Sequence, residues 1–124
     1  MSVIVTDRGF APDGWQGPVA ELPPEGGPEE LRALADVPMI RIHFAAFSDG
    51  RGFTLARRLR LQGYAGRLRA AGPLLADQYA MARRAGFDEV EIPDEIAARQ
   101  PWEQWQARAD WRAHDYQARL RGTA

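Results

Sequence analysis

The sequence predicts a small α/β domain in two or three layers, with a short parallel sheet built from two β-α-β crossovers and a C-terminal amphipathic helix. The length of 124 residues fits a single domain. Between residues 39 and 92, short apolar runs alternate with segments of helical periodicity, which is typical of alternating strands and helices. Both helical segments end at a glycine followed by an aromatic residue, Gly63-Tyr64 and Gly86-Phe87, and glycine commonly takes the left-handed conformation after a helix.

The first 38 residues are expected to form one strand followed by a poorly structured lead-in. Val3-Ile4-Val5 is apolar and β-branched, which favours a strand. From Gly9 to Pro28, glycine and proline interrupt the chain at short intervals and indicate turns. Pro28 suits the first position of a short helix, and Pro38 ends that helix at the latest.

The core of the domain is expected at residues 39–92. Predicted in order are a strand at 39–44, a helix at 53–62, a strand at 67–70, a helix at 74–85 and a strand at 89–92. In the first strand, Ile40, Ile42 and Phe44 share one face, whereas Arg41 and His43 lie on the other. Both crossovers are expected to be right-handed.

Residues 94–121 are expected to form one amphipathic helix. At about 100° per residue, an apolar stripe forms from Trp102, Trp105, Ala109, Ala113, Tyr116 and Leu120. Trp111 falls on the opposite side with Arg108 and Arg112, a residue combination that favours a protein interface. The alternative is that Trp111 packs against the lead-in.

Composition excludes several kinds of chemistry. The chain has no cysteine, and its sixteen basic residues are all arginine. Thiolate nucleophiles, disulfides, cysteine-held iron-sulfur clusters and Schiff-base lysines are therefore excluded. The two histidines are too isolated in sequence to predict a metal site, and no cofactor is expected. The absence of a leader or a long apolar segment predicts a cytoplasmic protein without a membrane partner.

The strongest candidate site is the segment from Phe47 to Thr54, between a predicted strand and the next helix. It lies at the carboxyl end of a parallel strand, where open α/β sheets bind ligands. Backbone amides near Gly50 and Gly52, together with Arg51, would suit a small oxyanion such as sulfite, sulfate or phosphate. Asp49 would cap the turn or orient Arg51. The candidate ligand or partner residues are Asp49, Gly50, Arg51, Gly52, Thr54, Arg57, Asp77 and Gln78.

Alternative interpretations of this segment remain open. Leu55 stands where a dinucleotide-binding fingerprint needs its third glycine, which argues against a Rossmann cofactor site. A purely structural role would have Arg51 pair with Asp77 and brace the two crossovers, and a third role is partner docking. Nucleic-acid binding is disfavoured, because the formal net charge is -1.

Three segments of this chain carry a family resemblance. They are Phe47-Ser48-Asp49-Gly50-Arg51-Gly52-Phe53-Thr54 with the arginine-rich run to Arg60, then Gly63-Tyr64-Ala65-Gly66, and then Asp77-Gln78 with Arg83-Arg84-Ala85-Gly86-Phe87-Asp88. Over about residues 38–92 the chain resembles a bacterial family of unknown function whose members are commonly labelled probable oxidoreductases of sulfite reduction. Their genes lie beside the gene for assimilatory sulfite reductase. The resemblance implies a place in sulfur assimilation.

The resemblance and the composition together give two functional hypotheses. The first is a non-catalytic accessory protein that docks on sulfite reductase or another sulfate-assimilation protein, because a chain without cysteine cannot hold the clusters that sulfite reduction uses. The second is a small oxyanion-binding enzyme or carrier that uses Asp49-Gly50-Arg51-Gly52. The open edges of a small sheet also predict a homodimer.

Overall fold

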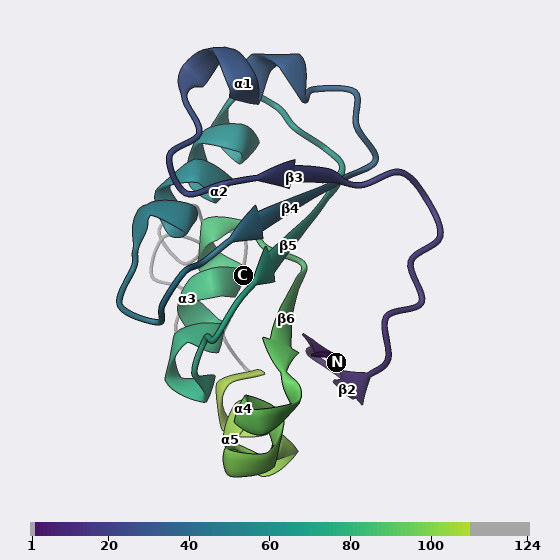
Figure 1. The fold of residues 1–124 in the computed structure, drawn as a ribbon, viewed down its shortest axis with the longest axis vertical. Coiled ribbons are helices and arrows are strands. Elements are labelled where there is room, and N and C mark those ends of the chain that lie inside the picture. The colour runs from purple at the N-terminus through teal and green to yellow at the C-terminus, as the bar shows by residue number, and fades with distance from the viewer. Residues whose placement is uncertain (1, 110–124) are drawn as a thin grey trace, which may run out of the picture.

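The structure is a computed structural model that describes residues 2–109 (Figure 1). The strands are β1 (Ser2–Thr6), β2 (Gly9–Ala11), β3 (Ala20–Leu22), β4 (Met39–His43), β5 (Arg67–Ala71) and β6 (Glu89–Pro93). The helices are α1 (Pro28–Ala33), α2 (Arg51–Leu61), the 3-10 turn η1 (Ala76–Gln78), α3 (Tyr79–Ala85), α4 (Asp94–Arg99) and α5 (Trp102–Ala109). No helix within the described range is long and apolar enough to cross a bilayer.

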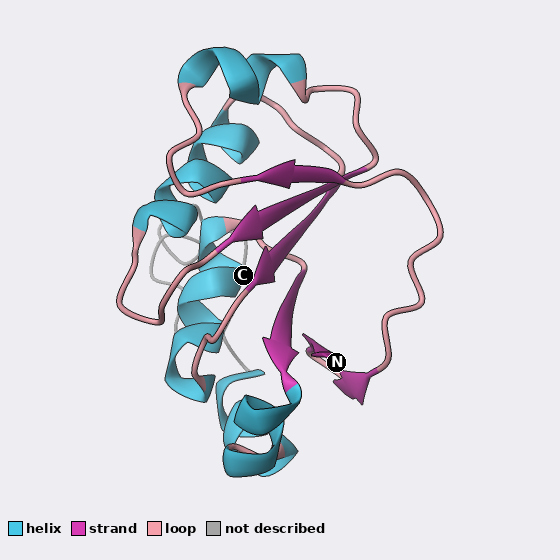
Figure 2. Ribbon diagram, in the orientation of Figure 1, coloured by secondary structure: helices cyan, strands magenta, loops and turns pink. Residues whose placement is uncertain are grey.

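The strands form one six-stranded sheet in the order β2-β1-β6-β5-β4-β3. The strands β3, β4, β5 and β6 run parallel, and β1 is antiparallel to both β6 and β2. Figure 2 shows the four parallel strands as a twisted fan. Helices α1, α2 and α3 connect these parallel strands in turn, so the carboxyl ends of β4, β5 and β6 lie along one edge of the sheet.

The helices cover one face of the sheet, which makes this the two-layer form of the predicted domain. Alternating strand residues point into that layer, and they form a core with α2, α3 and Trp105 of α5. The buried strand residues of this core are Val5, Leu22, Ile40, Ile42, Leu68, Ala70, Val90 and Ile92. Figure 1 shows α2 and α3 on the left of the strands and α1 at the top, and the lead-in between β2 and β3 runs along the right.

The predicted α/β class is confirmed, and the lead-in is more ordered than expected. The strand at Val3-Ile4-Val5 lies within β1, and the three strands of residues 39–92 are present as β4, β5 and β6. The lead-in, expected to be poorly structured, contributes β2 and β3. Each has only three residues, and β3 pairs only with β4 while β2 pairs only with β1. Tertiary pairing rather than local sequence therefore defines them.

Two predicted helices are divided in the structure. The helix expected at 74–85 is present as η1 followed by α3, and the side-chain oxygen of Gln78 accepts a hydrogen bond from the Leu75 amide where the helix begins (2.9 Å). The helix expected at 94–121 breaks between α4 and α5 at Gln100 and Pro101. Proline has no N–H to continue the first helix, and the Trp105 indole donates to the Gln100 carbonyl at 2.8 Å. Residues 110–121 lie outside the described part.

Two glycines allow the carboxyl ends of the strands to pack closely. A Cβ on Gly52 would lie 2.4 Å from the Phe44 ring, so the first turn of α2 sits directly on that ring. Gly72 has φ +148°, and a Cβ there would lie 2.2 Å from the Phe44 carbonyl oxygen. This contact keeps the chain after β5 against the chain after β4.

We expect Gly72→Ala to lower the free energy of unfolding by about 3 kcal/mol, because it adds a backbone clash to an unfavourable backbone conformation. Gly63 is the matched control: its φ is +95°, and nothing lies within 4 Å of a Cβ built on it. Gly63→Ala should lose only about 1 kcal/mol, the cost of the left-handed conformation itself. Urea unfolding followed by circular dichroism measures both, and equal losses would contradict the role of the Phe44 contact.

Candidate functional site

The β4–α2 loop, residues 44–50, lies at the carboxyl edge of the sheet, as the sequence predicts. Its backbone turns back on itself, because the Asp49 amide donates to the Ala46 carbonyl at 3.1 Å. Phe44 is buried against Phe53 of α2, with ring centroids 5.0 Å apart. The loop is therefore fixed at its start by packing and at its end by its own hydrogen bond.

Asp49 orients Arg51, one of the two roles predicted for it. The Asp49 carboxylate accepts hydrogen bonds from the Arg51 amide (3.2 Å), from Nε (3.0 Å) and from Nη2 (2.8 Å). The Arg51 side-chain hydrogen bond and the positive charge lower the pKa of Asp49, and the carboxylate raises the pKa of Arg51 in turn. The guanidinium at this helix start is thus already paired with a carboxylate.

The second crossover reaches the loop through Gln78 and not through Asp77. The Gln78 side-chain nitrogen donates to the Phe47 carbonyl at 2.6 Å, so Gln78, one of the candidate site residues, does lie beside the loop. Asp77 instead pairs with Arg108 of α5, with Nη2 and Oδ1 2.9 Å apart. The proposed brace between Arg51 and Asp77 is wrong, because Arg51 has a closer carboxylate two residues away and α5 brings its own arginine to Asp77.

Of the remaining predicted site residues, some are exposed on α2 and others lie outside residues 2–109. Thr54 and Arg57 are exposed on α2, and nothing in the structure joins them to Asp49. Phe47, at the tip of the β4–α2 loop, leaves 54% of its surface exposed. Trp111 and Arg112, around which an interface is predicted, lie outside residues 2–109.

A second polar region, not foreseen as a site, covers the sheet face opposite the helices. We call it the charged face: it consists of Glu21, Arg41, His43, Arg67, Arg69, Glu89 and Glu91 from the parallel strands, with Asp13 from the lead-in. Arg69 is only 4% exposed and Glu89 only 3%. Parallel sheets usually bury both faces beneath helices. Here, paired charges occupy the face on which no helix of residues 2–109 packs.

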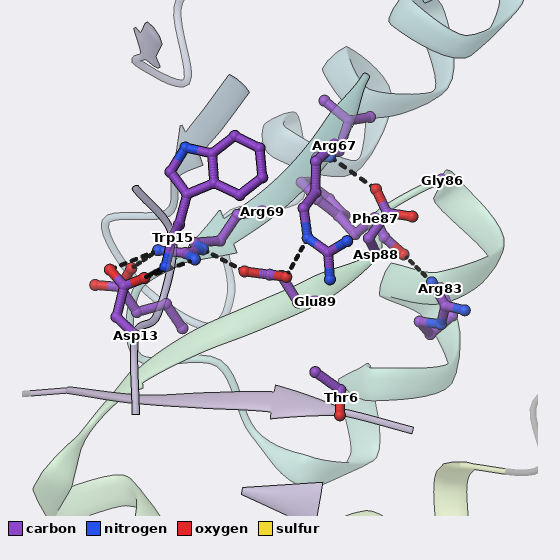
Figure 3. Close-up of polar contacts among 12 residues, drawn as sticks. Thr6, Asp13, Trp15, Arg67, Arg69, Arg83, Gly86, Phe87, Asp88 and Glu89 are labelled. Carbon is purple, nitrogen blue, oxygen red and sulfur yellow. Dashed lines mark hydrogen bonds and ion pairs between the residues drawn. The ribbon is translucent and has the colours of Figure 1, made fainter. Parts of the chain in front are cut away.

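Arginines and carboxylates of this face alternate along one row of contacts, in the order Arg41, Glu91, Arg69, Glu89 and Arg67. Arg41 donates to both oxygens of Glu91, from Nε at 3.0 Å and from Nη2 at 2.6 Å. Glu91 also accepts from Arg69 at 3.1 Å. Arg69 then meets Glu89 at 2.5 Å, and Glu89 meets Arg67 at 2.6 Å (Figure 3). Every carboxylate of the row lies between two arginines or beside one, so the row carries little net charge.

The pairing outweighs burial in the protonation of these groups. Burial raises the pKa of Glu91, but the hydrogen bonds and charge of Arg41 outweigh it and leave the pKa below its usual value. Burial likewise lowers the pKa of Arg69, yet its bonds to Asp13 and Glu89 leave that pKa raised. The hydrogen bond from Arg69 lowers the pKa of Asp13. All three groups are therefore held in their charged forms.

His43 lies at the end of the charged face near the carboxyl edge. Its Nε2 contacts Glu21, which also accepts a hydrogen bond from Arg41 at 2.9 Å. His43 is therefore a strand-surface histidine with a side-chain partner on the neighbouring strand β3. A hollow of about 250 Å³ next to it is lined by residues that include Arg41 and Glu91. Within residues 2–109, no group of histidine and carboxylate side chains is arranged to hold a metal ion.

The sequence contained one signal for the charged face. Arg41, Arg69, Glu89 and Glu91 occupy alternate positions of predicted strands, which places them on one face of each strand. Only the strand order brings them together, because Arg41 reaches across β5 to Glu91 at a point where β5 carries the small residue Ala71. No sequence pattern indicated that Asp13 would pair with Arg69, because Asp13 lies in the irregular segment between β2 and β3.

We expect Glu91→Gln to lower the free energy of unfolding at pH 7 by about 3 kcal/mol, because it leaves the largely buried Arg41 and Arg69 short of a carboxylate. A carboxylate whose pKa is lowered by folding contributes stability above its ordinary pKa, and that contribution is lost as the pH falls through the lower folded value. The variant should therefore lose stability less steeply below pH 4.5, the ordinary value for this group. Chemical unfolding at pH 2 to 7 measures this, with the exposed Glu103→Gln as a control. An unchanged pH profile would contradict the pairing.

Comparison with known proteins identifies one family whose model matches most of this chain. The model of a family described as "Bacterial protein of unknown function (DUF934)" matches residues 20–124. That range includes the β4–α2 loop and the strand residues of the charged face, and it leaves out β1, β2 and Asp13. No curated protein and no solved structure matches the chain. The chain belongs to this bacterial family of unknown function, DUF934.

Proposed function

We propose that the protein is a non-catalytic accessory protein of assimilatory sulfite reduction that docks on a partner protein through its β4–α2 loop. The observation that carries the docking role is Phe47, a large apolar side chain exposed on a loop that is otherwise held in place. Exposed aromatic residues on rigid supports lose little conformational freedom on binding, and aromatic residues are frequent among interface hot spots.

The loop is supported from three directions. Gln78 of η1 holds the Phe47 carbonyl, the Asp49–Ala46 hydrogen bond closes the turn, and Gly52 seats the first turn of α2 on the Phe44 ring. A partner would therefore meet a preformed surface. Arg51 lies four residues after Phe47, its side chain is 59% exposed, and its guanidinium stays paired with Asp49.

The geometry gives less support to an oxyanion site at Asp49-Gly50-Arg51-Gly52. Both the backbone amide and the guanidinium of Arg51 already donate to Asp49. An incoming anion would have to compete with a carboxylate only two residues away along the chain. Partner docking requires no such competition, because the Asp49–Arg51 pair stays intact.

The link to sulfite reduction comes from the sequence resemblance and not from the geometry. The absence of cysteine agrees with an accessory role, because the chain has no thiolate to hold an iron-sulfur cluster. Sulfite reductase and the proteins that act with it are therefore the partners to examine first. The homodimer, which we predict from the open edges of a small sheet, stays a prediction.

We expect the immobilised protein to retain assimilatory sulfite reductase, or a protein acting with it, from an extract of the source bacterium grown on sulfate. Phe47→Ala should reduce retention at least tenfold, since a hot-spot aromatic contributes more than about 1.4 kcal/mol. Leu61→Ala is the matched control, because Leu61 is 81% exposed near the far end of α2. Mass spectrometry of the eluate measures retention.

Two results would contradict the proposal. One is wild-type protein that retains no sulfate-assimilation protein, and the other is Phe47→Ala that retains as much as Leu61→Ala. Deletion of the gene gives an independent measurement of the pathway: growth should fail on sulfite and recover on sulfide. Calorimetry with sulfite tests the oxyanion alternative, which requires binding that Arg51→Ala abolishes.

A further inference from the structure

A hollow of about 270 Å³ lies between the lead-in and the charged face, beneath Trp15. Its lining includes Ile4, Thr6, Pro12, Trp15, Arg67 and Arg69. At the roughly 30 Å³ that one water molecule occupies in the liquid, the hollow has room for about nine non-hydrogen atoms. It lies near the start of β5, whereas the β4–α2 loop lies at the opposite edge of the sheet, so the two regions are independent.

Arg67 lines this hollow with a guanidinium group of which one nitrogen donates a hydrogen bond to a carboxylate. Its Nε donates to Glu89 at 2.6 Å. Among residues 2–109, neither Nη1 nor Nη2 has a hydrogen-bond partner, and the side chain is 44% exposed. A guanidinium with two free nitrogen donors can receive both oxygens of a planar anion.

Arg69 already binds a carboxylate from the lead-in. Its Nη1 and Nη2 donate to the two oxygens of Asp13 at 3.0 and 3.1 Å, the paired geometry in which arginine recognises carboxylates (Figure 3). Arg69 is buried, whereas the Asp13 side chain is 46% exposed. Asp13 also lies outside the residues that the family model matches, and Arg67 and Arg69 lie inside them. The matched part of the chain thus provides the two arginines, and a segment outside the match provides the carboxylate.

The walls of the hollow favour an apolar body on a singly charged ligand. Ile4 is buried, and the Trp15 indole N–H donates a hydrogen bond to the Pro18 carbonyl (3.3 Å), while the Trp15 backbone amide donates to the Asp13 carboxylate (3.0 Å). Glu89 lies between the two arginines and repels an anion more strongly the more charge it carries. A monocarboxylate meets these conditions better than sulfate or phosphate.

We propose that this hollow is a binding site for a small organic monocarboxylate. Arg67 holds the carboxylate and Trp15 covers the apolar body. Asp13 occupies the neighbouring Arg69 guanidinium, and its release makes a second arginine available to the ligand.

Benzoate, which has a planar carboxylate and a single ring, is the probe for this site. It is titrated into the ¹⁵N-labelled full chain at constant ionic strength, and the indole N–H of Trp15 and the amides of residues 13–17 are followed by NMR. We expect saturable shifts at these positions. Asp13→Asn should bind at least tenfold more tightly because it releases Arg69, and Arg67→Gln at least tenfold more weakly.

Arg99→Gln, an exposed change of the same charge on α4, is the matched control and should bind benzoate as the wild type does. Sodium sulfate should give no saturable shift at the same signals. The proposal is overturned if benzoate binds neither the wild type nor Asp13→Asn, or if Arg67→Gln binds as tightly as Arg99→Gln. Binding that is no tighter in Asp13→Asn overturns the role assigned to Arg69. The same spectra report whether each variant is folded.

Discussion

The buried guanidinium of Arg69 is the interaction on which the exposed side of this sheet depends. A charge with only 4% of its surface exposed is stable only when carboxylates compensate it, and Asp13 of the lead-in does so together with Glu89 and Glu91 of β6. This contact joins the lead-in to β5 and β6. It also explains how this sheet can bury arginines and carboxylates on the face that the described helices do not cover.

The charged face limits where the protein can act on other molecules. Most arginines and carboxylates of the face are committed to one another, so the row behaves as structure and offers few free charges. The groups that remain available lie at its margins. Arg67 has unpartnered nitrogens within the described residues, and His43 meets Glu21 beside a second hollow.

The two regions assigned to binding differ in how they are held. Local contacts support the β4–α2 loop, since Asp49, Arg51 and Gln78 close it and leave Phe47 exposed. The hollow beneath Trp15 is closed by an ion pair between Asp13 and Arg69, which are 56 residues apart. A preformed loop suits a protein partner. A site in which the Asp13 carboxylate occupies an arginine suits a small ligand that also carries a carboxylate. The opposite edges of the sheet keep these two roles apart.

Local sequence determined the elements that have strong internal patterns. Alternating apolar residues defined β4, β5 and β6, and Gly63 and Gly86 were correctly placed after helices, because side-chain periodicity and left-handed glycine are properties of a short segment. The sequence also located the β4–α2 loop and the closeness of Gln78 to it.

The tertiary structure alone decided which charged residues became partners. Three ion pairs show this: Arg51 with Asp49, Arg108 with Asp77, and Arg69 with Asp13. Which charged groups pair depends on their distances in the folded chain, and no local sequence pattern encodes those distances. The same reason applies to β2 and β3, since three-residue strands exist only where a neighbouring strand accepts their hydrogen bonds.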